Sequence, residues 1–177
     1  MTWTVPNVTF AFRQGDEAPE EGGCPIGGEF VFKTSAELFA NKRVIIFSLP
    51  GAFTPTCSTY QLPGFEEQFA DFQAHGIDDI YCISVNDAFV MNEWARSLGI
   101  KNVKVIPDGT GHFTRLMGML VNKDAIGFGY RSHRYAAIIN DGTVEKLFEE
   151  PGREDNFGGD PYGESSPENV MKYLKGE

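Results

Sequence analysis

A cysteine at the start of a predicted helix is the residue best placed to do chemistry in this chain. The segment Pro50 to Ser58 reads PGAFTPTCS and follows a hydrophobic run of strand length. Thr54 suits the N-cap, Pro55 the first helical position and Cys57 the third. There the thiol lies near unpaired backbone N–H groups and the positive end of the helix dipole, which favour negative charge. This placement predicts that Cys57 is a nucleophile.

The alternative for Cys57 is a buried, unreactive thiol, because free cysteines are among the residues most often buried. Two threonines and a serine flank it, however, and their hydroxyls would need partners in an apolar core. A free thiol with a pKa of about 8.5 is only a few per cent ionised at pH 7. Lowering that pKa to about 6.5 takes about 2.7 kcal/mol, whereas a helix terminus supplies about 1 kcal/mol. A reactive Cys57 therefore needs a second positive group.

The other thiols and the histidines form no metal-binding pattern. Cys24, Cys57 and Cys82 make an odd number with no CxxC spacing, so neither a disulfide framework nor a zinc site is predicted. The three histidines are scattered along the chain, whereas metal ligands usually cluster at short spacings. The sequence therefore does not indicate a metal.

Length and charge restrict the class of protein. The chain has 177 residues, 41% of them hydrophobic, which suits one domain over residues 1–177. A net charge of −10 disfavours binding to a phosphate backbone, so we expect no nucleic-acid partner. We find no basic region followed by an apolar run at the start and no apolar stretch of about 18 residues. We therefore expect no membrane partner and a cytoplasmic location, where thiols stay reduced.

Apolar runs predict the strands. RVIIFSL and IYCISV are nearly continuous apolar runs, as expected of strands that are buried on both faces. The Asp141-Gly142 pair between two such runs predicts a hairpin turn. The predicted strands, including a short edge strand or hairpin at the start, cover residues 8–12, 43–49, 80–85, 103–107, 134–140 and 143–149.

Helices are predicted between these strands, at residues 35–41, from 55 through Phe72, over 86–99, over 112–119, and from about 165 onward. Pro63 lacks an N–H, so it is expected to kink the helix that carries Cys57. Alternating strands and helices predict an α/β fold with a mixed central sheet flanked by helices, in a thioredoxin-like arrangement. Cys57 then follows the carboxyl end of a strand, where such sheets usually bind ligands.

Four segments closely resemble the peroxiredoxins: PGAFTPTCS, LPGF at residues 62–65, ISVNDAFVMNEWA at 83–95 and RYAAIINDG at 134–142. The chain is most similar to the atypical subfamily that includes plant type II enzymes, the mammalian atypical two-cysteine enzyme and bacterial peroxiredoxin–glutaredoxin fusions. The resemblance implies a thioredoxin fold with an N-terminal strand extension and thiol peroxidase activity without metal, flavin or another cofactor. It also implies a homodimer packed near the active site.

The resemblance assigns roles to four residues. Cys57 would attack hydrogen peroxide or a small alkyl hydroperoxide and become a sulfenic acid. Thr54 would orient peroxide and thiolate, and Pro50 would shield them from water. Arg134 would supply the second positive group, because arginine stays charged at any working pH. Considered singly, Thr54 could be only a helix cap, Pro50 only a strand terminator and Arg134 only a solvated charge at a strand end.

The resemblance also indicates how Cys57 is reduced again. No cysteine follows Cys82, so the C-terminal resolving cysteine of the mammalian relative is absent. Cys82 matches a plant cysteine of uncertain resolving role, but its apolar strand favours a buried structural thiol. Cys24 lies beside acids in a Gly- and Pro-rich segment and is interpreted as incidental. We therefore expect an external reductant, glutathione with a separate glutaredoxin, or else thioredoxin.

Two further residues and two other functions stay open. Many relatives have histidine where this chain has Gln61, so cationic help from that position is not expected. Arg131 either adds positive potential, binds carboxylates of the reductant or is a plain surface charge. A peroxide sensor or redox-relay protein could use the same cysteine, and a cysteine hydrolase would need a histidine base that no motif here provides.

Overall fold

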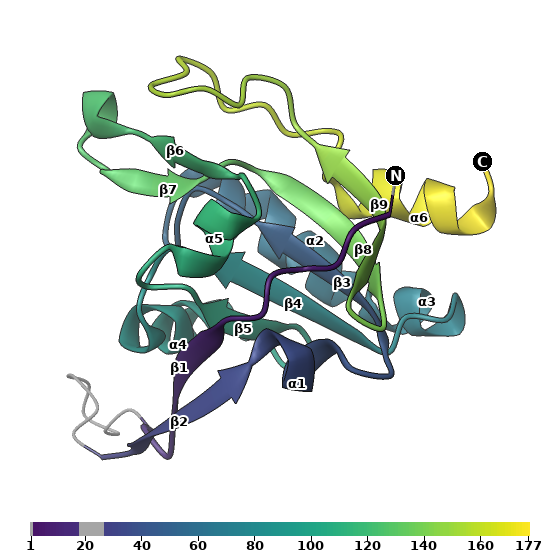
Figure 1. Cartoon of the computed structure of the whole chain (residues 1–177), viewed down its shortest axis with the longest axis horizontal. Helices are drawn as coiled ribbons and strands as arrows, with labels where there is room; N and C mark the ends of the chain where they lie inside the picture. Colours follow the sequence, from purple (N-terminus) through teal and green to yellow (C-terminus); the bar gives the residue numbers. More distant parts are fainter. Residues whose placement is uncertain (1, 18–26) are drawn as a thin grey trace.

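A mixed five-stranded sheet forms the centre of the fold (Figure 1). The computed structural model describes residues 2–17 and 27–177. β3 runs parallel to β4 and β4 parallel to β5, whereas β8 is antiparallel to both β3 and β9. This confirms the mixed sheet predicted from the sequence. The strands lie side by side in the order β5 (Lys104–Pro107), β4 (Asp79–Ser84), β3 (Arg43–Ser48), β8 (Tyr135–Asn140) and β9 (Thr143–Glu149).

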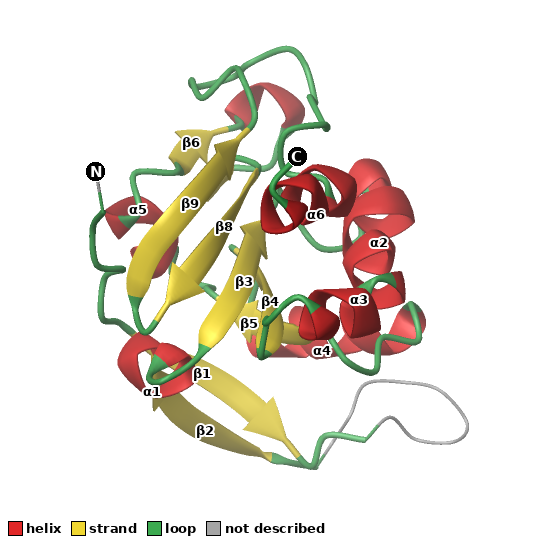
Figure 2. Cartoon of the chain, turned by 90° about the vertical axis from the view of Figure 1, so that its right-hand side faces the viewer, coloured by secondary structure: helices red, strands yellow, loops and turns green. Residues whose placement is uncertain are grey.

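Helices cover both faces of the sheet, and Figure 2 shows α2, α3 and α6 together on one of them. The buried side chains of that face form one core with α4, and those of the opposite face form a second core with α1 and α5. The helices are α1 (Ser35–Phe39), α2 (Leu62–Glu67), α3 (Phe69–Ala74), α4 (Ala88–Ser97), α5 (His112–Leu116) and α6 (Pro167–Lys175).

Alternation along the central strand separates the two cores. In β3, Ile45 and Phe47 belong to the core under α2, where Phe47 stacks on Phe65 with ring centroids 4.3 Å apart. Val44 and Ile46 belong to the opposite core. Because every one of these side chains is buried, β3 is a rigid element whose carboxyl end has a fixed position.

The N-terminal part forms a hairpin beside this sheet. β1 (Thr9–Gln14) pairs antiparallel with β2 (Glu29–Thr34), which confirms the hairpin alternative predicted near residues 8–12. Thr34 and Glu37 then form a capping box that starts α1. Within the described ranges, no helix has the length and apolar character needed to cross a bilayer.

The helix predicted after residue 55 is divided into three parts. A π-helical turn, η1 (Cys57–Gln61), comes before α2, and a break at Gln68 separates α2 from α3. The N–H of Leu62 bonds to the carbonyl of Cys57, five residues back. Pro63 has no N–H to offer Thr59, so the interruption that the sequence predicts takes the form of this widened turn directly before Pro63. Cys57 is therefore the first residue of an irregular segment.

A short hairpin between α5 and β8 was not predicted. β6 (Leu120–Asn122) and β7 (Tyr130–Ser132) pair antiparallel around η2 (Asp124–Ile126), a 3-10 turn. Each strand has three residues, too few to show an alternating pattern. The predicted helix over 112–119 ends earlier, at Leu116, because Gly118 adopts a positive φ of 74°.

Candidate active site

Cys57 lies on the first helical turn after β3, as the sequence predicts. The chain turns through residues 50–54 at the carboxyl end of β3 and enters the helix at Pro55. The carbonyl of Thr54 accepts a hydrogen bond from the N–H of Ser58 at 3.0 Å, as an N-cap carbonyl does. The side chain of Cys57 is fully buried. Its sulfur is therefore removed from bulk water, and fixed charges act more strongly there.

The Thr54 hydroxyl is not a helix cap. Its Oγ1 donates to the carbonyl of Gly51 at 2.7 Å. With its one proton committed there, the hydroxyl oxygen offers only its lone pairs to any further partner. This turn also holds Phe53 with φ of 63°, in the left-handed region that bulky residues rarely adopt.

The side chain of Arg131 packs against the turn at Pro50 and Gly51. Arg131 Nη1 donates to the carbonyl of Pro50 at 3.1 Å, and its Nε donates to the carbonyl of Phe128 at 3.2 Å. A Cβ on Gly51 would lie 2.3 Å from Arg131 Nη1, so a larger residue there would displace the Arg131 guanidinium from this position. Burial lowers the pKa of Arg131, although the nearby charge of Cys57 opposes that effect. Arg131 is therefore a half-buried positioning group rather than a plain surface charge.

Arg134 supplies the positive group beside Cys57. It directly precedes β8, whose Tyr135 pairs with Ser48 at the end of β3, so the antiparallel register brings Arg134 to the turn. Its Nη1 lies 3.5 Å from Cys57 Sγ, and the residue is 3% exposed. Burial lowers the pKa of Arg134, but the charge of Cys57 and the bond to Asp160 outweigh it, so the net pKa is raised.

Gln61 shares the same guanidinium nitrogen. Its Oε1 accepts from Arg134 Nη1, and its Nε2 donates to Ser165 Oγ at 3.3 Å. Ser165 Oγ in turn donates to a carboxylate oxygen of Glu150 at 3.3 Å. Gln61, Ser165 and Glu150 are all buried. Gln61 therefore provides a neutral acceptor that fixes Arg134, and no cation.

The loop between β9 and α6 completes the surroundings of Arg134. Asp160 Oδ1 accepts from Arg134 Nη2 at 2.7 Å, and the ring of Tyr162 lies 5.8 Å from the guanidinium carbon. The carboxylate of Glu150 accepts from the backbone N–H groups of residues 163–165, which holds this loop in place. Neither Asp160 nor Tyr162 was predicted from sequence, because the loop has no periodic pattern.

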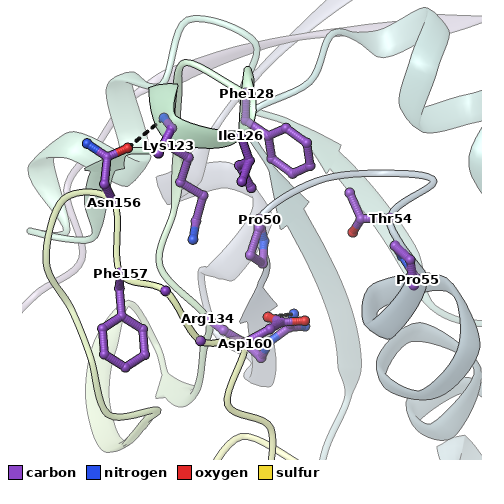
Figure 3. A pocket seen from close by; sticks show the side chains of 13 residues that line it. Pro50, Thr54, Pro55, Lys123, Ile126, Phe128, Arg134, Asn156, Phe157 and Asp160 are labelled. Carbon is purple, nitrogen blue, oxygen red and sulfur yellow. Dashed lines mark hydrogen bonds and ion pairs between the residues drawn. The ribbon is translucent and has the colours of Figure 1, made fainter.

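A pocket of about 350 Å³ opens above these residues (Figure 3). Three of the four predicted site residues line it, namely Pro50, Thr54 and Arg134. Cys57 lies beneath them, in contact with Arg134. The structure thus brings all four predicted residues together at one site. The remaining lining residues are Pro55, Lys123, Ala125, Ile126, Phe128, Asn156, Phe157, Gly158, Gly159 and Asp160.

Cys82 and His133 do not line the pocket. Cys82 is fully buried in the middle of β4, and burial raises its pKa well above the ordinary value. Cys57 and Cys82 are both free thiols. Cys24, which is interpreted as incidental from the sequence, lies outside the described residues. His133 is buried, with Nε2 bonded to the carbonyl of Glu150, and over residues 2–17 and 27–177 no cluster of potential metal ligands occurs.

Comparison with known proteins identifies the family. The model of the redoxin family matches residues 13–160. A peroxiredoxin of Rhizobium etli is 61% identical over 99% of this chain and 96% of its own length. The chain belongs to the peroxiredoxins. The resemblance noted from the four sequence segments is thereby confirmed, and the function supported at this level is thiol-dependent peroxidase activity.

A second curated relative and a crystal structure are also similar to this peroxiredoxin over nearly its whole length. A hybrid peroxiredoxin of Haemophilus influenzae is 49% identical over 96% of this chain and 64% of its own length. The crystal structure of the Plasmodium falciparum antioxidant protein, a 1-Cys peroxiredoxin, has a TM-score of 0.89 and 37% identity, covering 98% of each chain. Such agreement in sequence and backbone confirms the thioredoxin-like fold class.

The ion pair between Arg134 and Asp160 predicts a pH dependence of stability. Burial raises the pKa of Asp160, but its bonds to Arg134 and Thr56 outweigh burial and leave that pKa lowered. Its contribution to stability is therefore complete above the pKa of an unfolded aspartate, about 3.9, and is lost as the pH falls through the lower folded value. In urea unfolding, Asp160→Asn should be less stable than the unchanged protein at pH 7, by less than about 1 kcal/mol.

The two proteins should converge as the pH falls below the lowered pKa of folded Asp160, where its carboxyl is protonated in the unchanged protein as well. The exposed Glu154, in the same loop, provides the control: Glu154→Gln should match the unchanged protein throughout. A stability difference for Asp160→Asn that persists in acid, or none at pH 7, contradicts this assignment.

Proposed function

We propose that this peroxiredoxin reduces hydrogen peroxide and small alkyl hydroperoxides through a sulfenic acid on Cys57. The observation that carries the proposal is the buried guanidinium of Arg134, whose Nη1 lies 3.5 Å from Cys57 Sγ. The thiolate sulfur attacks the terminal peroxide oxygen, so an S–O bond forms while the O–O bond breaks. Sulfur is oxidised by two electrons, and the departing oxygen takes a proton and leaves as water or an alcohol.

Arg134 is proposed to stabilise both ends of this reaction. Its positive charge favours the anionic sulfur before the attack, and its fixed N–H groups favour the negative oxygen that develops as O–O breaks. Gln61 and Asp160 accept from the two terminal nitrogens of Arg134, so the guanidinium is oriented before peroxide arrives. That orientation supports catalysis, because no reorganisation is then needed during the reaction.

Thr54 and Pro50 are proposed to orient and shield the peroxide. Thr54 Oγ1 gives its proton to Gly51, so it can accept the O–H of a bound peroxide and hold the terminal oxygen, which carries that hydrogen, next to sulfur. Pro50 is buried at the base of the pocket and has no N–H that could hold water. Its carbonyl is occupied by Arg131.

Reduction of the sulfenic acid is proposed to use glutathione and glutaredoxin. A glutathione thiol attacks the sulfenic sulfur and releases water, leaving a mixed disulfide, which a second thiol cleaves to restore Cys57. The full burial of Cys82, with its raised pKa, supports an external thiol over Cys82 as the resolving group. Thioredoxin is the alternative reductant.

The domain organisation, cellular location and oligomeric state are also proposals. We infer one domain over residues 1–177 and a cytoplasmic location. A homodimer packed near the pocket is supported by exposed apolar side chains close to it: Phe53 is 54% exposed and Ile126 62%.

Cysteine variants test the one-cysteine scheme. Cys57→Ser should abolish peroxide consumption, because an alcohol at this position cannot form a sulfenic acid. Cys82→Ala removes the second thiol without placing a hydroxyl in the core and should retain most turnover with glutathione and glutaredoxin. Turnover is followed as peroxide lost per enzyme. A folded Cys82→Ala protein that has lost all turnover would show that Cys82 is the resolving cysteine.

Separate reductant systems test the proposed recycling step. Steady-state peroxide reduction is measured with glutathione alone, with glutathione plus glutaredoxin, and with thioredoxin plus its reductase. The glutathione–glutaredoxin system should give the highest rate. Support by thioredoxin alone contradicts the proposed reductant. Rapid oxidation of Cys57 with slow recycling in every system would instead identify a peroxide sensor.

Thr54 variants test the role of its hydroxyl. Thr54→Val keeps the shape of the side chain but removes the oxygen, and should slow oxidation of Cys57 roughly 100-fold, the cost of losing one positioned hydrogen-bonding group. Thr54→Ser keeps the oxygen and should recover most of the rate. Stopped-flow oxidation by hydrogen peroxide measures both. If Thr54→Val reacts as fast as the unchanged protein, Thr54 has only a structural role at the helix start.

A further inference from the structure

The pocket above Cys57 is much larger than hydrogen peroxide needs. Its volume is about 350 Å³, within the range of pockets that bind small organic molecules, whereas a molecule the size of water occupies about 30 Å³. Apolar side chains also line it, chiefly Ile126, Phe128 and Phe157. This space fits the apolar body of a larger hydroperoxide whose peroxide group reaches Thr54 and Arg134.

One side of the pocket is held by hydrogen bonds between two distant segments. Asn156 Oδ1 accepts from the N–H of Ala125 at 2.8 Å, and the N–H of Asn156 donates to the carbonyl of Asn122 at 2.7 Å. The ring of Phe157 fits closely against Gly152 and Gly159, since a Cβ on either glycine would lie under 3.0 Å from it. The pocket is therefore formed before any ligand binds.

Lys123 places a charge in this apolar pocket. Figure 3 shows its side chain extending into the pocket, with Phe157 and Pro50 on either side of it in this view. Within the described part of the chain, no carboxylate lies within 4.0 Å of its ammonium group, although carboxylates outnumber cations overall and give a net charge of −10. Asp160, the one acidic residue of the lining, is paired with Arg134 and interacts with Lys123 only electrostatically, from beyond 4.0 Å.

We propose that this pocket binds organic hydroperoxides that carry a carboxylate on an apolar body, and that Lys123 selects them. The inference rests on the proposed peroxidase function. The peroxide end meets Thr54 and Arg134, the apolar body packs on Phe128 and Phe157, and the carboxylate pairs with Lys123. Glutathione also carries carboxylates, but the apolar lining favours the hydroperoxide.

The test compares hydroperoxides that differ in one charge. One pair is cumene hydroperoxide and its para-carboxylated derivative; the other is a fatty-acid hydroperoxide and its methyl ester. Stopped-flow rates of Cys57 oxidation give, for each pair, the ratio of charged to uncharged substrate. Lys123→Met should lower this ratio roughly fivefold in at least one pair, the size of a partly screened ion pair. Lys123→Arg should keep the ratio of the unchanged protein. Added salt should reduce the difference in ratio between the unchanged protein and Lys123→Met.

Lys175→Met, at an exposed position on α6, is the matched control and should leave the ratio unchanged. The proposal is wrong if Lys123→Met leaves both ratios unchanged or if Lys175→Met lowers them equally. It is also wrong if Lys123→Met slows only the glutathione step, because the carboxylate is then that of the reductant. If no hydroperoxide oxidises Cys57 in the unchanged protein, the proposed function itself fails.

Discussion

The contact between the Arg134 guanidinium and the Cys57 sulfur is the interaction on which this site depends. A sulfur that is fully buried would favour its neutral form, and a helix terminus offers only about 1 kcal/mol to the anion. Arg134 adds a permanent charge 3.5 Å away, on a side chain that is itself buried. A buried guanidinium needs partners of its own, and Gln61 and Asp160 provide them.

The fold supplies this arrangement through a few rigid connections. The antiparallel register of β3 and β8 fixes Arg134 beside the turn that carries Cys57. Glu150, at the end of β9, holds the loop that delivers Asp160 and reaches Gln61 through Ser165. The π-helical turn beginning at Cys57 is irregular by comparison. Rigid surroundings and the widened turn that carries Cys57 are therefore next to one another.

Much of this could be predicted from sequence where short-range physics decides the outcome. Continuous apolar runs predict β3 and β4, a cap at Asn86 or Asp87 predicts the start of α4, where the structure has Asp87, and the Thr-Pro-x-Cys spacing predicts the position of Cys57. The role of Arg134 depended on the family resemblance. Asp160 could not be predicted, because its contact to Arg134 depends on how an aperiodic loop folds back. The bond from Gln61 to Ser165 spans 104 residues and leaves no local signal.

The most direct test of the central claim is the second-order rate constant for oxidation of Cys57 by hydrogen peroxide in Arg134 variants. Arg134→Met removes the charge and should slow the reaction at least roughly 100-fold at neutral pH. Arg134→Lys keeps a charge but has one terminal nitrogen where Arg134 uses two, so its rate should fall between that of Arg134→Met and that of the unchanged protein. An Arg134→Met protein that remains folded and reacts as fast as the unchanged protein would contradict the account.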